Sequence, residues 1–153
     1  MTGRRGGRTL TVLALSLVGG AVRAEGAPPS GPAAPPPVAV TASCEHRQTK
    51  GRVLCDVELE AANGRLAWAD VLVVRAPPFA APLRARVQGS DARVRTEQRI
   101  RISVAFVATS LGKGTVALRA RAVLCTKTGE SETCVPRTED AEAELSVGTD
   151  VVR

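Results

Sequence analysis

Four cysteines are the residues of this 153-residue chain whose chemistry stands out. Four cysteines allow three disulfide connectivities. Cys44 and Cys55 flank a turn at 48–51, and Cys125 and Cys134 flank a turn near 129–130. Antiparallel strands joined by such a turn place the two members of each pair opposite one another. We therefore predict the hairpin disulfides Cys44–Cys55 and Cys125–Cys134.

One alternative connectivity joins Cys55 to Cys125, with Trp68 between them in the sequence. This spacing copies the Cys–Trp–Cys pattern of immunoglobulin domains. Strand phase argues against it, because an inward Cys125 would also turn Arg119 and Arg121 inward. Burying two unpaired guanidinium groups costs far more than a disulfide contributes. The hairpin pairing is therefore preferred.

The two predicted bridges differ in the face that they occupy. Cys44 and Cys55 share the inward phase of their strands, so their bridge is predicted to be structural. Cys125 and Cys134 follow the outward phase among polar residues, where an attacking thiolate could reach the disulfide. This pair is the candidate redox-active site. His46 is a single turn histidine, and oxidised cysteines leave no metal or cofactor site to expect.

The segment Gly114–Val147, GTVALRARAVLCTKTGESETCVPRTEDAEAELSV, resembles the end of the N-terminal periplasmic domain of the transmembrane thiol:disulfide interchange reductase family. The family pattern is a strand ending in Cys, a short polar loop, Cys-x-Pro and a closing strand. Cys125, Cys134 and Pro136 match it. The resemblance implies an immunoglobulin-like fold and a cysteine pair that relays electrons to periplasmic partners. The chain departs from the family in its longer loop, in lacking aromatic residues to shield the pair, and in its additional pair Cys44–Cys55.

The N-terminal residues predict export. Three arginines precede an apolar stretch at 10–18, and small residues end a possible cleavage site at Ala24. Residues 1–24 are thus predicted to be a signal peptide, followed by a Pro/Ala-rich linker at 25–37 and a folded domain at 38–150. An exported chain reaches the periplasm or the exterior, where disulfides persist. The apolar stretch is too short to span a bilayer, so it is predicted to be cleaved rather than kept as an anchor, and no stable membrane insertion is expected after cleavage.

Removing the signal peptide changes the charge argument. The whole chain has 21 basic and 15 acidic residues and a net charge of +6. Four arginines precede the predicted cleavage site, so the remainder has 17 basic residues and a net charge of +2. That balance argues against nucleic acid as a partner. Four arginines are predicted to form a basic stripe on one strand, which is either a contact for an acidic partner or a solvated strand: Arg93, Arg95, Arg99 and Arg101.

Apolar residues alternate with polar ones in seven segments, which predicts an all-β domain. These segments are 38–44, 53–59, 66–75, 83–87, 99–106, 116–124 and 140–147. Seven short strands favour an immunoglobulin-like β-sandwich, with Trp68, Phe79 and Phe106 as its large core rings. Asn63-Gly64 instead suggests a tight hairpin that would keep two strands in one sheet, so another sandwich or a small barrel stays open. The last two strands should pair Arg119 with Asp140.

Three functions are compatible with these patterns. The first, which the sequence favours, is a non-catalytic exported sandwich that binds a protein or a cell-envelope component. The second is thiol–disulfide exchange through Cys125 and Cys134. The third is a small secreted enzyme, ranked last because no further catalytic arrangement is visible.

Overall fold

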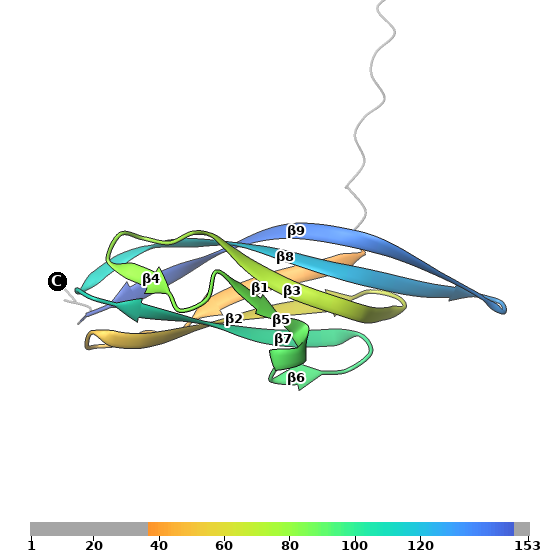
Figure 1. Ribbon diagram of the computed structural model, residues 1–153, viewed down its shortest axis with the longest axis horizontal. Helices are drawn as coiled ribbons and strands as arrows, with labels where there is room; N and C mark the ends of the chain where they lie inside the picture. Colours follow the sequence, from red (N-terminus) through yellow and green to blue (C-terminus); the bar gives the residue numbers. More distant parts are fainter. Residues whose placement is uncertain (1–36, 149–153) are drawn as a thin grey trace, which may run out of the picture. The chain divides into compact units, whose positions relative to one another are not determined.

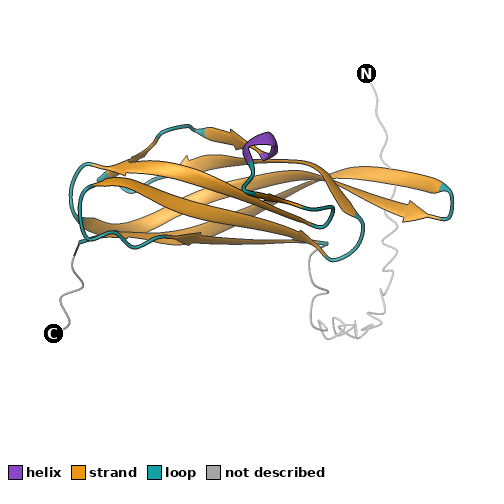
Figure 2. Cartoon of the chain, turned by 90° about the horizontal axis from the view of Figure 1, so that it is seen from below, coloured by secondary structure: helices purple, strands orange, loops and turns teal. Residues whose placement is uncertain are grey.

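Alternating apolar residues line one face of each long strand, and the computed structural model, which describes residues 37–148, packs these faces together (Figure 1). Apart from the short 3-10 turn η1, Gly89–Asp91, its regular elements are all strands (Figure 2). The strands are β1 Val38–Cys44, β2 Gly51–Ala61, β3 Arg65–Arg75, β4 Ala80–Pro82, β5 Arg86–Gln88, β6 Val94–Arg95, β7 Arg99–Ala108, β8 Gly112–Thr128 and β9 Ser131–Val147.

The strands form two antiparallel sheets. Sheet A has the order β1-β2-β7-β4, with β6 also paired to β7, and sheet B has the order β5-β3-β8-β9. Immunoglobulin domains have strands A-B-E-D in one sheet and C′-C-F-G in the other. Here β1, β2 and β7 take the places of A, B and E, and β5, β3, β8 and β9 take those of C′, C, F and G. The predicted immunoglobulin-like β-sandwich is therefore confirmed.

The core is built from aliphatic side chains around the ring of Phe106, and the predicted core ring Phe79 packs partly buried against it. Phe106 is fully buried, and its largest buried companions are Leu59, Ile100 and Ile102. Cys55 is also fully buried, so the Cys44–Cys55 disulfide faces the core as predicted. Small aliphatic residues each bury little area, and covalent cross-links therefore contribute a larger share of the stability.

Two local expectations are wrong. The Asn63-Gly64 turn carries the chain from β2 in sheet A to β3 in sheet B, so it is not a hairpin. Of the predicted strand at 83–87, only 86–87 form a strand, β5 at an edge of sheet B, while 83–85 connect it to β4 at an edge of sheet A. Leu83 still donates its N–H to Ala105 of sheet A, whereas the N–H of Val73 in sheet B bonds Ala85. The chain changes sheets between these two bonds.

The hairpin of β8 and β9 is longer than expected. Each strand has 17 residues, and their pairing is continuous from Gly112↔Val147 to Thr128↔Ser131. The far end of the hairpin reaches beyond the neighbouring strand β3 (Figure 1). This end carries Cys125 and Cys134, so the candidate redox pair lies where sheet B narrows to two strands.

The predicted signal peptide and all but the last residue of the predicted linker lie outside the described residues. Within residues 37–148, the chain has no helix long and apolar enough to cross a membrane.

Candidate functional site

Cys125 and Cys134 are bonded, as predicted from the hairpin spacing. They are directly opposite one another in the β8–β9 register. Their Cα atoms are 4.0 Å apart. This short separation is typical of a non-hydrogen-bonded pair of an antiparallel ladder, in which the two residues exchange no backbone hydrogen bonds. The register of β3 adds Arg65 to the same row, so the outer face of sheet B has a row Arg65–Cys125–Cys134.

The two sulfur-bearing residues differ in accessibility. Cys134 is exposed, but Cys125 is only 2% exposed, so the expectation that the whole bridge is accessible is wrong for Cys125. Gly64 approaches so closely that a Cβ there would lie 2.3 Å from the Cys125 carbonyl oxygen. The β2–β3 crossover therefore covers one half of the bridge, which strand phase alone cannot reveal.

An ion pair lies beside the disulfide. Arg65 donates Nε to Oε1 and Nη2 to Oε2 of Glu132, each at 2.9 Å. The hydrogen bond from Arg65, aided by its charge, lowers the pKa of Glu132, so this carboxylate is ionised at neutral pH. One Glu132 carboxylate oxygen and both cysteine sulfurs lie within 4.8 Å of one another. The intact bridge has no thiolate to offer a metal ion, and Arg65 neutralises the charge of Glu132 beside it.

A hollow of about 410 Å³ opens next to the bridge. The crossover and the hairpin line it together, and its walls include Asn63, Glu97 and Lys127 besides Cys125. Both signs of charge face this hollow, so it has no single electrostatic preference.

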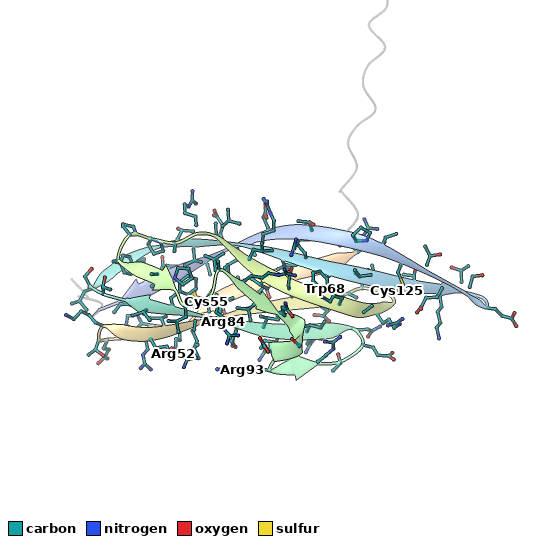
Figure 3. All side chains as sticks on the ribbon, viewed as in Figure 1. Arg52, Cys55, Trp68, Arg84, Arg93 and Cys125 are labelled. Atoms are coloured by element: carbon teal, nitrogen blue, oxygen red, sulfur yellow. A yellow bond between two sulfur atoms is a disulfide. The ribbon has the colours of Figure 1, made fainter. Side chains whose placement is uncertain are left out.

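Trp68 is on the outer face of sheet B, and its prediction as a core ring is wrong. Its side chain is 39% exposed. The cause is a register shift between Leu66 and Trp68, which leaves Ala67 without a partner on β8. A bulge of this kind reverses the phase of the residues that follow it. Trp68 and Cys125 thus lie toward the same end of sheet B (Figure 3).

Two arginines flank the Trp68 ring. The Cζ atoms of Arg86 and Arg121 lie 6.0 and 5.8 Å from the ring centroid. Beneath them is Asp70, the one buried charged residue of the described chain, at 0% exposure. It accepts Arg121 Nε at 2.9 Å, Arg121 Nη2 at 2.5 Å and Arg86 Nε at 2.5 Å. Cation–π contacts and charge-assisted bonds together hold the ring and both guanidinium groups in place.

The register defines a surface that we call the Trp68 patch. Trp68 is opposite Val123, and Val123 is opposite Pro136, so an apolar row crosses three strands next to the disulfide row. Arg86 and Arg121 border this row through Asp70. The patch consists of Trp68, Val123, Pro136, Arg86 and Arg121.

Elsewhere, cross-strand ion pairs cover both outer faces. On sheet B the predicted pair Arg119–Asp140 is confirmed, with Nε at 2.7 Å from Oδ1. On sheet A, Arg101 and Arg99 of β7 bond Glu58 of β2. The single-strand basic stripe is wrong, because Arg93 and Arg95 belong to the separate segment around β6. Arg95 donates to the carbonyls of Gly89 and Ala67, the latter being the bulge residue.

Sequence reasoning missed several members of this site. Asp70 and Trp68 stand two residues apart in an apolar run, and a lone Asp within such a run was a usable signal for a paired carboxylate. Arg65 and Glu132 carried no signal, because their contact joins residues 67 apart in the chain.

Comparisons with known proteins identify no family. No protein-family model matches the chain, and no curated protein matches it in sequence. Among solved structures, PapD-like domain 7 of human CEP192 has 10% identity and a TM-score of 0.40, covering 78% of this chain and 94% of that one. AggA, the major subunit of Escherichia coli aggregative adherence fimbriae, has 12% identity and a TM-score of 0.33, covering 72% and 95%. BslA, a bacterial hydrophobin, also has 12% identity and a TM-score of 0.33, covering 77% and 97%. Likenesses this low carry no functional argument, and the fold assignment rests on the strand order.

Proposed function

We propose that this protein is a non-catalytic, exported binding domain that uses the Trp68 patch to contact a partner protein. The observation that carries the proposal is a large, half-exposed tryptophan beside two guanidinium groups on an otherwise charge-paired sheet face. Tryptophan and arginine are the residue types most enriched among the energetically dominant positions of protein interfaces.

The electrostatics of the patch favour an acidic partner. Asp70 is hidden from solvent, while the side chains of Arg86 and Arg121 are 47% and 37% exposed. An approaching molecule therefore meets two cations and an aromatic edge, although the cluster as a whole carries a net charge of only +1. Arg121 donates to Asp70 through Nε and Nη2, and Arg86 through Nε, which leaves further N–H groups directed away from this carboxylate. These donors suit carboxylates.

Protein is a better fit than a polysaccharide. Both guanidinium groups near the Trp68 ring bond Oδ2 of Asp70, so they approach the ring from the same side and place N–H donors next to it. A partner side chain could pack against the ring edge and the apolar row formed with Val123 and Pro136. The preference for a protein partner follows from this geometry.

Photo-crosslinking tests the proposal. A benzoylphenylalanine at Gln88, an exposed position of β5 opposite Asp70, places the probe beside the patch. In cells that produce the protein, we expect a crosslinked partner that disappears when Trp68→Ala is added. A probe at Leu111, an exposed apolar residue of the β7–β8 turn, is the matched control. The same crosslinked species from both probes, or one that Trp68→Ala leaves unchanged, would contradict the proposal.

A second function, thiol–disulfide exchange, is favoured by the exposure of Cys134 beside the Trp68 patch. A partner dithiol would supply the two electrons. One partner thiolate attacks Cys134 Sγ and forms a mixed disulfide with it, while the Cys125–Cys134 bond breaks and its electron pair leaves on Cys125, which takes up a proton. The second partner thiolate then attacks the partner sulfur of the mixed disulfide, which closes a disulfide within the partner and releases Cys134 as a thiolate. This step is compatible with the burial of Cys125, because the leaving sulfur needs no access.

A redox titration in glutathione buffers separates the two functions. Mass spectrometry of alkylated peptides would count the thiols of each cysteine pair. Opening of Cys125–Cys134 alone near roughly −200 mV would support exchange, since structural bridges lie below about −300 mV. Resistance of both bridges until the fold is lost would leave binding as the function.

A further inference from the structure

The outer edge of β9 is an unpaired strand edge in the described domain. Among residues 37–148, β8 is the only strand that pairs with β9, which runs along the rim of sheet B (Figure 1). Its last residues are covered, because Arg47 donates to the Ser146 carbonyl and accepts from the Gly148 N–H. Before Ser146, no backbone group of residues 37–148 other than those of β8 bonds this strand, although β1 of sheet A packs close to β9. A long free edge is a template for another strand.

Two observations show which backbone groups face this edge. The Cα separation of 4.0 Å makes Cys125↔Cys134 a pair without mutual backbone bonds, so the N–H and C=O of Cys134 point away from β8. The groups that Arg47 engages belong to Ser146 and Gly148, which share this even-numbered phase. The even-numbered residues from 132 to 144 therefore face the free edge, with Pro136 contributing only its carbonyl.

The charges on β9 divide into two groups. Four acidic residues have basic partners within the chain: Glu132, Asp140, Glu142 and Glu144. Arg137 and Glu139 have no ion-pair partner among the described residues, since β8 sets Ala122 and Ala120 opposite them. These two opposite charges flank Thr138. An antiparallel copy of β9 centred on Thr138 would set each Arg137 against Glu139 of the other copy.

We propose that a second copy of this chain pairs with the edge of β9 about a two-fold axis at Thr138. The Thr138 residues of the two copies then exchange two backbone hydrogen bonds. Arg137 and Glu139 form two symmetric cross-strand ion pairs, and Val135 lies opposite Ala141 of the partner copy. Pro136 removes one N–H donor in each half, while its carbonyl still accepts from Asp140. The two sheets B become one, and the closed symmetry stops the assembly at a dimer.

Edge strands also carry proline and charges to prevent pairing. Two like charges would serve that purpose, because they would repel a second copy. The pair on β9 is of opposite sign and symmetric about one residue, so self-pairing neutralises it. The same register sets Glu132 opposite Glu144 of the other copy, but Arg65 and Lys113 of their own chains already pair these two carboxylates. This symmetry favours a second copy of the chain over an unrelated strand.

Sedimentation velocity on the purified full chain tests the proposal. The wild type should sediment as a dimer that dissociates on dilution. Thr138→Pro should give only monomer, because it removes the two central bonds without removing a bond to β8. Circular dichroism would confirm that this variant keeps its sheets. A wild-type monomer at every concentration, or a dimer unaffected by Thr138→Pro, would overturn the proposal.

Charge reversal provides a second test that does not depend on proline. Arg137→Glu alone and Glu139→Arg alone should each weaken the dimer by at least tenfold, because like charges then face each other. An equimolar mixture of these two variants should dimerise, since one copy then presents two acidic side chains at these positions and the other presents two basic ones. Failure of the mixture to dimerise would contradict the two-fold register. Trp68→Ala should leave the dimer intact, so this inference and the proposed binding function can fail separately.

Discussion

The buried carboxylate of Asp70 allows a quantitative prediction of stability. Arg121→Ala removes two of its three arginine hydrogen bonds, those from Nε and Nη2, and leaves the one from Arg86. A bond to a charged group contributes about 1.5 kcal/mol or more, so the two together amount to about 3 kcal/mol. This value is at the lower end of the cost of breaking a buried ion pair. We expect the free energy of unfolding at neutral pH to fall by this amount.

Urea unfolding under non-reducing conditions measures this loss. Trp68 is the single tryptophan of the chain and lies against Arg121, so its fluorescence reports on the cluster while circular dichroism reports on the sheets. Coincident transitions would support two-state analysis. The control is Arg119→Ala, two residues away on β8, whose ion pair with Asp140 is exposed. Exposed ion pairs contribute little to stability, so Arg119→Ala should lower the free energy of unfolding by less than a third of the loss caused by Arg121→Ala.

A double-mutant cycle isolates the ion pair. Replacing Asp70 by Asn removes the buried charge, so Arg121→Ala should cost much less in the Asp70→Asn background than in the wild type. Equal losses from Arg121→Ala and Arg119→Ala would refute the reasoning. The reasoning would also be refuted if Arg121→Ala lowered the free energy of unfolding equally in the wild type and in the Asp70→Asn background.

The remaining predictions concern pH, one turn and one disulfide. Burial alone would raise the pKa of Asp70, but hydrogen bonds from arginine outweigh it and hold this pKa below the ordinary 3.8. Because the pKa of Asp70 is lower in the folded state, its ionisation stabilises the fold above pH 3.8, and this stabilisation is lost as the pH falls through the folded-state pKa. Acid unfolding should therefore begin below pH 3.8. In urea titrations at several pH values, Asp70→Asn should flatten the dependence of the unfolding free energy on pH. Gly64→Ala should destabilise the domain by more than about 2 kcal/mol, because φ is +84° and the new Cβ would meet a carbonyl oxygen at 2.3 Å. Gly129→Ala, at φ +64° with open space around it, should cost only about 1 kcal/mol, and equal losses would show that crowding is unimportant. Replacing Cys44 and Cys55 together by Ala should lower the free energy of unfolding by about 2.8 kcal/mol, the loop-closure value for a separation of 11 residues, and an unchanged urea midpoint would contradict it.

Local patterns were sufficient for the elements and both bridges. Alternating burial along β2 and β7 made these strands visible, because a sheet with one covered face imposes a period of two. The pairs Cys44–Cys55, Cys125–Cys134 and Arg119–Asp140 followed from hairpin registers alone. In a hairpin, the turn brings residues together whatever the rest of the fold does.

The site depended on contacts between distant segments. The bulge at Ala67 turns Trp68 outward, and its carbonyl is bonded by Arg95, 28 residues further along the chain. Cys125 is buried where the β2–β3 crossover meets β8, with Gly64 against its backbone carbonyl. By itself, the sequence determined an all-β domain of hairpins with two local disulfides, since these depend on spacing and strand phase. Only the tertiary structure decided which half of the second bridge is accessible and that the tryptophan faces outward, because both depend on the crossover and the bulge that the packing of the two sheets imposes.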